Sequence, residues 1–184
     1  ALTIRTPRDA VAAGIAYIPE DRRGQGLATA MSLDANLTLA HMAAVADGLG
    51  IIDFGREAEV AHRYIDLLKI KTPGRRHPVR LLSGGNQQKV VIGKWLLREP
   101  RLFIFDEPTR GIDVGAKYAI YEILDDLAAR GIGVILISSE LPEILGMTDR
   151  VAVFHRGRIV RVLETGRTDQ EDIMHDASGF GARA

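Results

Sequence analysis

The stretch LLSGGNQQKVV (residues 81–91) places a serine and two adjacent glycines directly before an apolar run with a helical pattern. A glycine is about 1 kcal/mol less favourable than alanine inside a helix, so two of them there need a reason. Ser83 suits the N-cap, and the amide groups of Gly84, Gly85 and Asn86 would then lie at the positive end of the helix. Helix N-termini bind anions, and a residue without a Cβ lets a phosphate approach the backbone. The stretch predicts either a phosphate-binding turn or simply a capped helix after a loop.

The stretch LFIFDEP (residues 102–108) has the pattern of a buried strand, and Asp106 and Glu107 follow at its carboxyl end. Ligands of open α/β sheets collect at such strand ends. Two adjacent carboxylates suit two tasks, because one can hold Mg²⁺, directly or through water, while the next polarises a water for phosphoryl transfer. An acidic loop after any buried strand is the alternative, and the following PTRGID favours the site.

Further elements are predicted on both sides of these stretches. The apolar runs at 14–18 and 133–139 predict buried strands, and helix-separated strands that are apolar on both faces indicate a mainly parallel α/β sheet. The polar segment 20–27 is expected to be a loop, and the tail 178–184 to be disordered. The block 29–82 has only helical patterns, so we expect a helical insertion in which Asp34 and Asn36 are turn or cap residues. Helices are expected at 36–45, 56–70, 87–98, 113–129 and 141–145, and a hairpin over 150–163 that turns at Arg156 and Gly157.

Composition limits the class of protein. Of 184 residues, 46% are hydrophobic and 26% charged, as in ordinary globular proteins, and 24 basic against 24 acidic residues give no overall attraction to nucleic acid or anionic membranes. The absence of cysteine excludes disulfides and thiolate metal sites, and the five histidines lack metal-ligand spacing. No apolar run reaches the roughly 20 residues of a membrane span. Because the chain starts at Ala1 in mid-pattern, we expect it to be part of a longer one.

Together the motifs resemble the ATP-binding cassette (ABC) ATPases. LSGGNQQKV is similar to the signature motif of that family, LFIFDE to Walker B, and RGID (residues 110–113) to the D-loop. The resemblance covers nearly the whole chain and implies an α/β ABC ATPase cassette, P-loop NTPase-like, incomplete at the N-terminus. It implies a catalytic core over 1–28 and 83–164, a helical subdomain over 29–82, and a C-terminal helix and tail over 165–184.

Finer features narrow the resemblance. YIPEDR, LSGGNQQK, DEPTRGIDVGAK and ISSELPEILG are similar to the second cassette of the tandem ATPases that energise bacterial monosaccharide importers. This implies ATP and Mg²⁺, a partner cassette, transmembrane permease subunits and, indirectly, a periplasmic sugar-binding protein, on the cytoplasmic face of the inner membrane and without nucleic acid. The RRGQG segment is either a solvated basic patch or a permease contact. Zero net charge and the short helical block disfavour an ABC protein that works on DNA or ribosomes.

The resemblance also assigns roles to single residues. Asp106 and Glu107 are the expected catalytic carboxylates, with Asp106 holding Mg²⁺ through water. Glu20 stands where most cassettes carry the Q-loop glutamine and is a second candidate near Mg²⁺. Asp113 is either an inter-cassette contact or the N-cap of the next helix, or both. The residues expected to contact nucleotide are Ser83, Gly84, Gly85, Asn86, Gln87, Glu20, Asp113 and Ser139.

The sequence departs from the family pattern at several points. It contains no G-x-x-x-x-G-K-[ST] motif, and its one Gly-Lys pair, Gly93 and Lys94, is followed by Trp95 inside an expected helix. Ser139 replaces the usual switch histidine and lacks an imidazole to carry a proton. We therefore expect the isolated chain to be inactive, and its signature to serve ATP on a partner cassette. Two functions stay open: an ATPase subunit of a sugar importer, and a catalytically silent half that only completes the partner's site.

Overall fold

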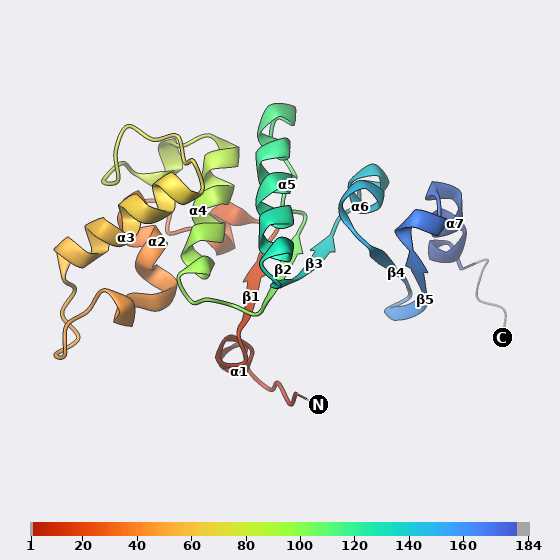
Figure 1. The fold of residues 1–184 in the computed structure, drawn as a ribbon, viewed down its shortest axis with the longest axis horizontal. Helices are drawn as coiled ribbons and strands as arrows, with labels where there is room; N and C mark the ends of the chain where they lie inside the picture. The colour runs from red at the N-terminus through yellow and green to blue at the C-terminus, as the bar shows by residue number, and fades with distance from the viewer. Residues whose placement is uncertain (1, 180–184) are drawn as a thin grey trace. The chain divides into compact units, whose positions relative to one another are not determined.

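The computed structural model describes residues 2–179, and the chain divides into two compact units, Ala1–Ile135 and Leu136–Ala184 (Figure 1). The predicted tail 178–184 falls mostly outside the described residues. The first unit contains the sheet, the helical block and most of the expected site residues, so it is treated first.

The central sheet has the order β1-β2-β3, formed by β1 (Ile15–Ile18), β2 (Leu102–Asp106) and β3 (Gly133–Ile137). β1 and β2 are parallel, with Ala16 opposite Phe103 and Ile18 opposite Phe105, and these four side chains are at most 1% exposed. The other face is open among the described residues, since Tyr17 is 44% exposed. The three predicted strands are confirmed, but β3 is not buried as predicted, since its residues are exposed or half-buried.

Helices α4 (Gly84–Leu96) and α5 (Val114–Ala129) accompany the sheet (Figure 1). α4 supplies the fully buried Val90, Val91 and Ile92, and it begins three residues before the expected residue 87. α5 begins after Asp113, whose side chain accepts a hydrogen bond from the Ala116 amide, and it is followed by the expected Gly131 with φ +80°. A short helix, α1 (Pro7–Ala12), precedes β1.

The segment expected to be a loop after β1 contains a helical turn of π type, Arg22–Gly26. Asp21 begins this turn, because its carboxylate accepts a hydrogen bond from the Gly24 amide at 2.9 Å. The turn ends against α4, where a Cβ on Gly26 would lie 3.0 Å from Val91. The loop prediction is wrong because this order comes from contacts with a helix about 65 residues further along the chain.

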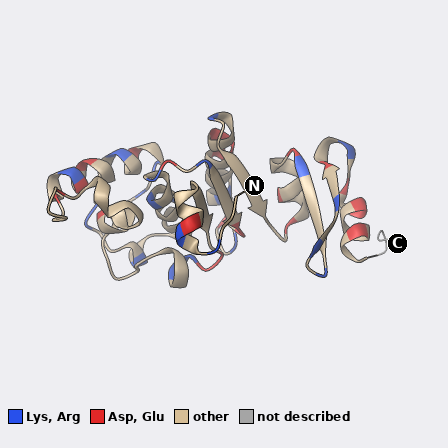
Figure 2. Cartoon of the chain, turned by 90° about the horizontal axis from the view of Figure 1, so that it is seen from below, with Lys and Arg blue, Asp and Glu red and all other residues tan. Residues whose placement is uncertain are grey.

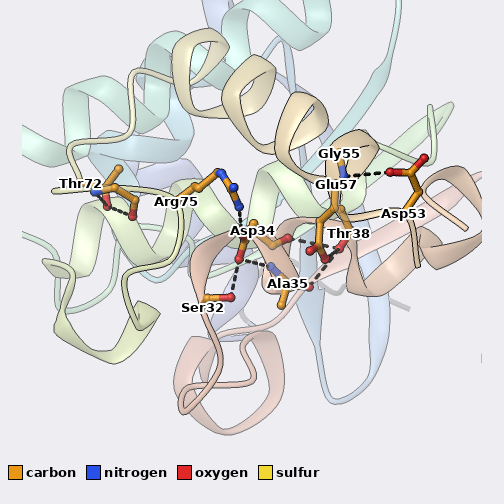
Figure 3. A network of polar contacts seen from close by, with 10 residues as sticks. Ser32, Asp34, Ala35, Thr38, Asp53, Gly55, Glu57, Thr72 and Arg75 are labelled. Carbon is orange, nitrogen blue, oxygen red and sulfur yellow. Dashed lines mark hydrogen bonds and ion pairs between the residues drawn. The ribbon is translucent and has the colours of Figure 1, made fainter. Parts of the chain in front are cut away.

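Residues 29–82 form the expected helical block. It consists of α2 (Leu33–Thr38), α3 (Phe54–Leu67) and the 3₁₀ turns Leu39–Ala44 and Val79–Leu81. Asp34 and Asn36 were expected to be turn or cap residues, but they lie within α2 after its N-cap Ser32 and are 4% and 0% exposed. Asp34 forms an ion pair with Arg75 at 2.6 Å (Figure 3), while Asn36 bonds both the amide and the carbonyl of Ala28. These buried polar contacts hold α2 to the chain before and after it.

The second unit contains an antiparallel hairpin, β4 (Arg150–His155) and β5 (Arg158–Glu164), with α6 (Leu141–Met147), α7 (Gln170–Ala177) and the 3₁₀ turn Thr165–Arg167. The hairpin turns at Arg156 and Gly157, as predicted, and both have positive φ, +48° and +76°. Two central residues with positive φ match the right-handed twist of paired strands. The core of the unit consists of Ile144, Val151, Val153, Leu163 and Ile173.

Candidate functional site

The carboxyl ends of β1 and β2 are joined by polar contacts. The Tyr17 hydroxyl donates to Asp106 Oδ2 at 2.7 Å, and Arg110 forms an ion pair with Glu20. These contacts follow from the parallel register, which sets Tyr17 opposite Ile104 and so brings the two strand ends together. Tyr17 and Arg110 were not among the predicted site residues, although each stands close to a predicted strand end.

Asp106 and Glu107 lie half-buried where β2 ends. Glu107 has φ +46°, the left-handed region that a residue with a Cβ enters only at a cost of roughly 1–3 kcal/mol. The Arg110 amide donates to the Glu107 carbonyl at 3.1 Å, so a tight turn stabilises this conformation. The strand end thus fixes the backbone that carries both predicted catalytic carboxylates.

Mg²⁺ usually binds one or two carboxylates and keeps waters and substrate oxygens as its other ligands. Asp106 fits this pattern, because Tyr17 occupies only one of its two oxygens. Glu20 is exposed, and its Oε1 is paired with Arg110. Among residues 2–179 no group of three or more His, Cys, Asp or Glu side chains is placed to hold a metal by itself. The metal role of Glu20 therefore stays a prediction.

The pKa of the Tyr17 phenol depends on its neighbour Asp106. The hydrogen bond to Asp106 is the main reason why the pKa of the Tyr17 phenol is raised above 10.0, with burial and the charge of Asp106 acting in the same direction. A raised phenol pKa means that the neutral hydroxyl is the favoured donor to Asp106. The ionisation of Tyr17 therefore reports whether its hydrogen bond to Asp106 is present.

The expected phosphate-binding turn lies at the start of α4. Ser83 is exposed and has the extended backbone of an N-cap, but its side chain forms no capping bond to the helix. Instead its hydroxyl accepts a hydrogen bond from Asn86 Nδ2 at 2.8 Å, and Asn86 Oδ1 accepts one from the Lys71 amide at 2.8 Å. The first amides of a helix have no partner within it, so the start of α4 keeps the positive end that an anion needs.

The two glycines of this turn also have packing reasons. A Cβ on Gly85 would lie 2.6 Å from the Cβ of Ala116 in α5, closer than side chains tolerate. A Cβ on Gly84 would lie 2.9 Å from Nη2 of Arg22. The bare backbone thus allows α5 and Arg22 to approach α4, independently of any ligand.

Gln87 is 0% exposed, whereas Ser83 in the same motif is exposed. Its Nε2 donates to the carbonyls of Val79 and Leu82 at 3.1 Å each, and its Oε1 accepts from Arg23 Nε at 3.1 Å. Both the nitrogen and the oxygen of the Gln87 side-chain amide are therefore hydrogen-bonded within the chain. The expectation that Gln87 contacts nucleotide disagrees with this burial, which suits a residue that holds the loop before α4.

Two other predicted residues lie elsewhere. Asp113 is exposed and caps α5, in agreement with the N-cap alternative, while its inter-cassette contact stays a prediction. Ser139 is exposed in the second unit, just after β3, and its switch role also stays a prediction. Two surface hollows of about 300 and 470 Å³ include none of Ser83, Asp106 and Glu107.

The surface carries charges of both signs. Basic and acidic residues are interspersed along both units rather than gathered in one segment (Figure 2). None of the helices in residues 2–179 combines the length and apolar character needed to cross a membrane.

Comparison with known proteins gives relatives along the whole chain. A relative in Agrobacterium fabrum, whose name describes a ribose/galactose/methyl galactoside import ATP-binding protein, is 63% identical over 183 residues, 100% of this chain and 36% of the relative. The ribose import ATP-binding protein RbsA of Geobacillus kaustophilus is 54% identical, over 96% of this chain and 35% of its own length. The xylose import ATP-binding protein XylG of Thermoanaerobacter pseudethanolicus is 49% identical, over 97% and 35%. The chain thus spans about a third of the length of these curated relatives.

Solved structures agree on the fold. A nucleotide-free ATP-binding cassette from an ABC transporter matches with a TM-score of 0.70 at 22% identity, over 95% of this chain and 68% of that one. A dimeric cassette in a post-hydrolysis state, bound to ADP and Pi, matches with a TM-score of 0.69 at 18% identity, over 87% and 68%. The family model described as ABC transporter matches residues 3–110, which include β1, the helical block, α4 and β2. The chain therefore belongs to the ABC transporter family and has the α/β fold of its ATP-binding cassettes.

Proposed function

We propose that this chain is the second cassette of an ATP-hydrolysing subunit of a bacterial sugar importer. Its main task is to offer the turn of Ser83, Gly84 and Gly85 to ATP held by a partner cassette. The observation that carries the proposal is the exposed Ser83 directly before the first amides of α4. Relatives named for ribose and xylose import support the choice of a sugar importer.

The turn suits a ligand that arrives from outside the chain. Ser83 is exposed, and its hydroxyl is held by Asn86, so its position is fixed before any ligand binds. A preorganised donor avoids reorganisation when charge arrives. The terminal phosphate of ATP would meet the amides at the start of α4, whereas ADP lacks that phosphate. Because a ligand shifts a conformational equilibrium only by its differential affinity, ATP would favour the closed pair of cassettes and hydrolysis would reopen it.

The proposed assembly includes the partner cassette, transmembrane permease subunits and, indirectly, a periplasmic sugar-binding protein. A related fold forms a dimer bound to ADP and Pi, which supports a paired arrangement. The chain would work at the cytoplasmic face of the inner membrane, where closure of the pair moves the permease. Its cofactors are ATP and Mg²⁺, for which Asp106 is the candidate ligand and Glu107 the candidate base that polarises water.

A second function is favoured by one specific observation. Glu20, which stands at the Q-loop position, forms an ion pair with Arg110. With glutamate at this position and serine rather than histidine at position 139, the local site departs from the family pattern at two points. This favours a catalytically silent half that only completes the partner's site. Glu107→Gln in the full-length protein separates the two: complete loss of turnover indicates a working local site, and a loss of less than about twofold indicates the silent half.

Ser83→Arg in the full-length transporter tests the proposal. The long cation fills the exposed turn, so turnover of ATP and sugar transport should both be lost. Nucleotide binding to the partner cassette should survive, because Ser83 does not belong to the phosphate-binding loop of the partner cassette. Equilibrium binding of a fluorescent ATP analogue, measured beside the ATPase rate, distinguishes these results. Undiminished turnover would contradict the proposal.

A further inference from the structure

Arg22 lies where three segments of the first unit meet: the turn after β1, the start of α4 and the loop after β2. Its Nη1 donates to the carbonyl of Arg110 at 3.0 Å, and its Nη2 to that of Gly111 at 3.4 Å. The same Nη2 would lie 2.9 Å from a Cβ on Gly84, so the guanidinium lies against the first residue of α4. One side chain therefore contacts both the expected phosphate-binding turn and the loop that leads to Asp113.

The remainder of the Arg22–Gly26 turn follows α4. Arg23 donates to Gln87, Gly26 packs against Val91, and the Gly26 carbonyl accepts a hydrogen bond from Lys94. Gly84, Gln87, Val91 and Lys94 are spaced three, four and three residues apart, which places them on one side of a helix. The turn is thus fixed to α4 along its length, and Arg22 is the contact that also reaches the loop after β2.

An arginine is suited to this junction. Its guanidinium is a planar fork of five donors, so one side chain can bridge two carbonyls, which the compact ammonium of lysine matches poorly. Burial lowers the pKa of Arg22, and its Nε is buried without a hydrogen-bond partner within residues 2–179. Burying a charged group in this way is unfavourable. The two hydrogen bonds that link the turn after β1 to the loop after β2 offset this cost.

We propose that Arg22 is a positioning residue that holds the turn of residues 83–85 and the loop of residues 110–113 as one surface toward the partner cassette. The inference rests on the proposed function, because that function gives this surface its ligand. Arg22 touches backbone carbonyls and not the substrate. Its removal should therefore slow turnover through the misplacement of Ser83, while nucleotide stays bound to the partner cassette.

Steady-state ATPase kinetics of the full-length transporter test this role. Arg22→Ala should lower kcat about tenfold, the effect of losing one good hydrogen bond to a charged group, with KM for ATP within about twofold of the parent. Arg22→Lys should recover part of the loss, because the ammonium still reaches one carbonyl. Arg56→Ala is the matched control, since this exposed arginine of α3 pairs only with the neighbouring Asp53, and it should leave both constants unchanged.

A double variant makes the test specific. Gly84→Ala should lower kcat because the new Cβ displaces the guanidinium, and adding it to Arg22→Ala should cause little further loss. Independent effects would multiply instead. If kcat is unchanged in Arg22→Ala while Ser83→Arg abolishes turnover, the positioning role of Arg22 is overturned and the proposed function stands. If Ser83→Arg keeps full turnover, the proposed function itself is overturned. A raised KM at constant kcat would mean direct nucleotide binding and also overturns the inference. If Arg22→Ala fails to fold, Arg22→Lys and Gly84→Ala take its place, and a parental kcat in both of these variants overturns the inference.

Discussion

Replacing Gly85 with alanine tests why α4 begins with glycine. An ideal Cβ at Gly85 would lie 2.6 Å from the Ala116 Cβ. Carbon atoms in unstrained contact are about 3.5–4.0 Å apart, so α4 and α5 would have to separate locally by about 1 Å. An overpacked contact of this kind destabilises a protein by about 1–3 kcal/mol. Alanine is itself up to about 1 kcal/mol better than glycine in a helix, which opposes the loss.

Gly115→Ala is a control that removes this opposing term. Gly85 and Gly115 are each the second residue of their helix, α4 and α5. A Cβ on Gly115 would meet nothing closer than 3.6 Å, an ordinary contact. The helix preference therefore cancels between the two variants, and Gly85→Ala should be less stable than Gly115→Ala by about 1–3 kcal/mol.

Urea unfolding of the chain, followed by circular dichroism, measures this difference. A rescue variant sharpens it: in the Ala116→Gly background, Gly85→Ala should no longer destabilise, because the opposing methyl group is gone. Equal stability of Gly85→Ala and Gly115→Ala, within about 0.5 kcal/mol, would refute the packing account. The glycine would then be explained by its ligand alone.

Three further outcomes are expected. Asp34→Ala should lower the free energy of unfolding by about 3 kcal/mol, because it leaves the half-buried Arg75 without its carboxylate, whereas Asp126→Ala in an exposed pair should change it by less than about 1 kcal/mol. The raised pKa of Tyr17 means that the stability from its hydrogen bond is complete below pH 10.0 and is lost as pH rises through the folded-state pKa. Asp106→Asn should therefore shift part of the phenolate absorbance titration to lower pH, and an unshifted curve would contradict the contact. Calorimetry of the chain alone should detect no ATP binding, and micromolar affinity would mean that its nucleotide contacts lie elsewhere than at the turn of residues 83–85.

Local patterns predicted the elements whose signals are local. The strands Ile15–Ile18 and Leu102–Asp106 are short apolar runs that end at a proline or at carboxylates, and the hairpin turns where Gly157 permits a positive φ. The start of α5 at Asp113 and the glycine after its end follow the ordinary preferences of helix ends. Family membership likewise followed from short motifs, which the family model and the relatives confirm.

Features that depend on distant contacts were not predictable in this way. α4 begins at Gly84, and its second residue, Gly85, packs against Ala116, about 30 residues away in the chain. The ion pair between Glu20 and Arg110 joins residues 90 positions apart, so the sequence pattern gave no sign of it. Gln87 belongs to the same motif as Ser83, yet helical geometry turns it into the core. The motif therefore predicted a candidate site, while only the fold showed which of its members are exposed and which are buried.

The central claim is that the turn before α4 faces ATP held by another cassette, and a distance measurement tests it most directly. The chain contains no cysteine, so Leu81→Cys, at a 58% exposed position two residues before Ser83, offers one thiol for a spin label within it. The label would be placed in the full-length transporter, with any cysteine elsewhere replaced and with Mn²⁺ supplied in place of Mg²⁺. The account predicts that the Mn²⁺ bound with ATP at the partner cassette lies close to the label, and that it moves away after hydrolysis to ADP. The same long distance with ATP and with ADP would contradict it.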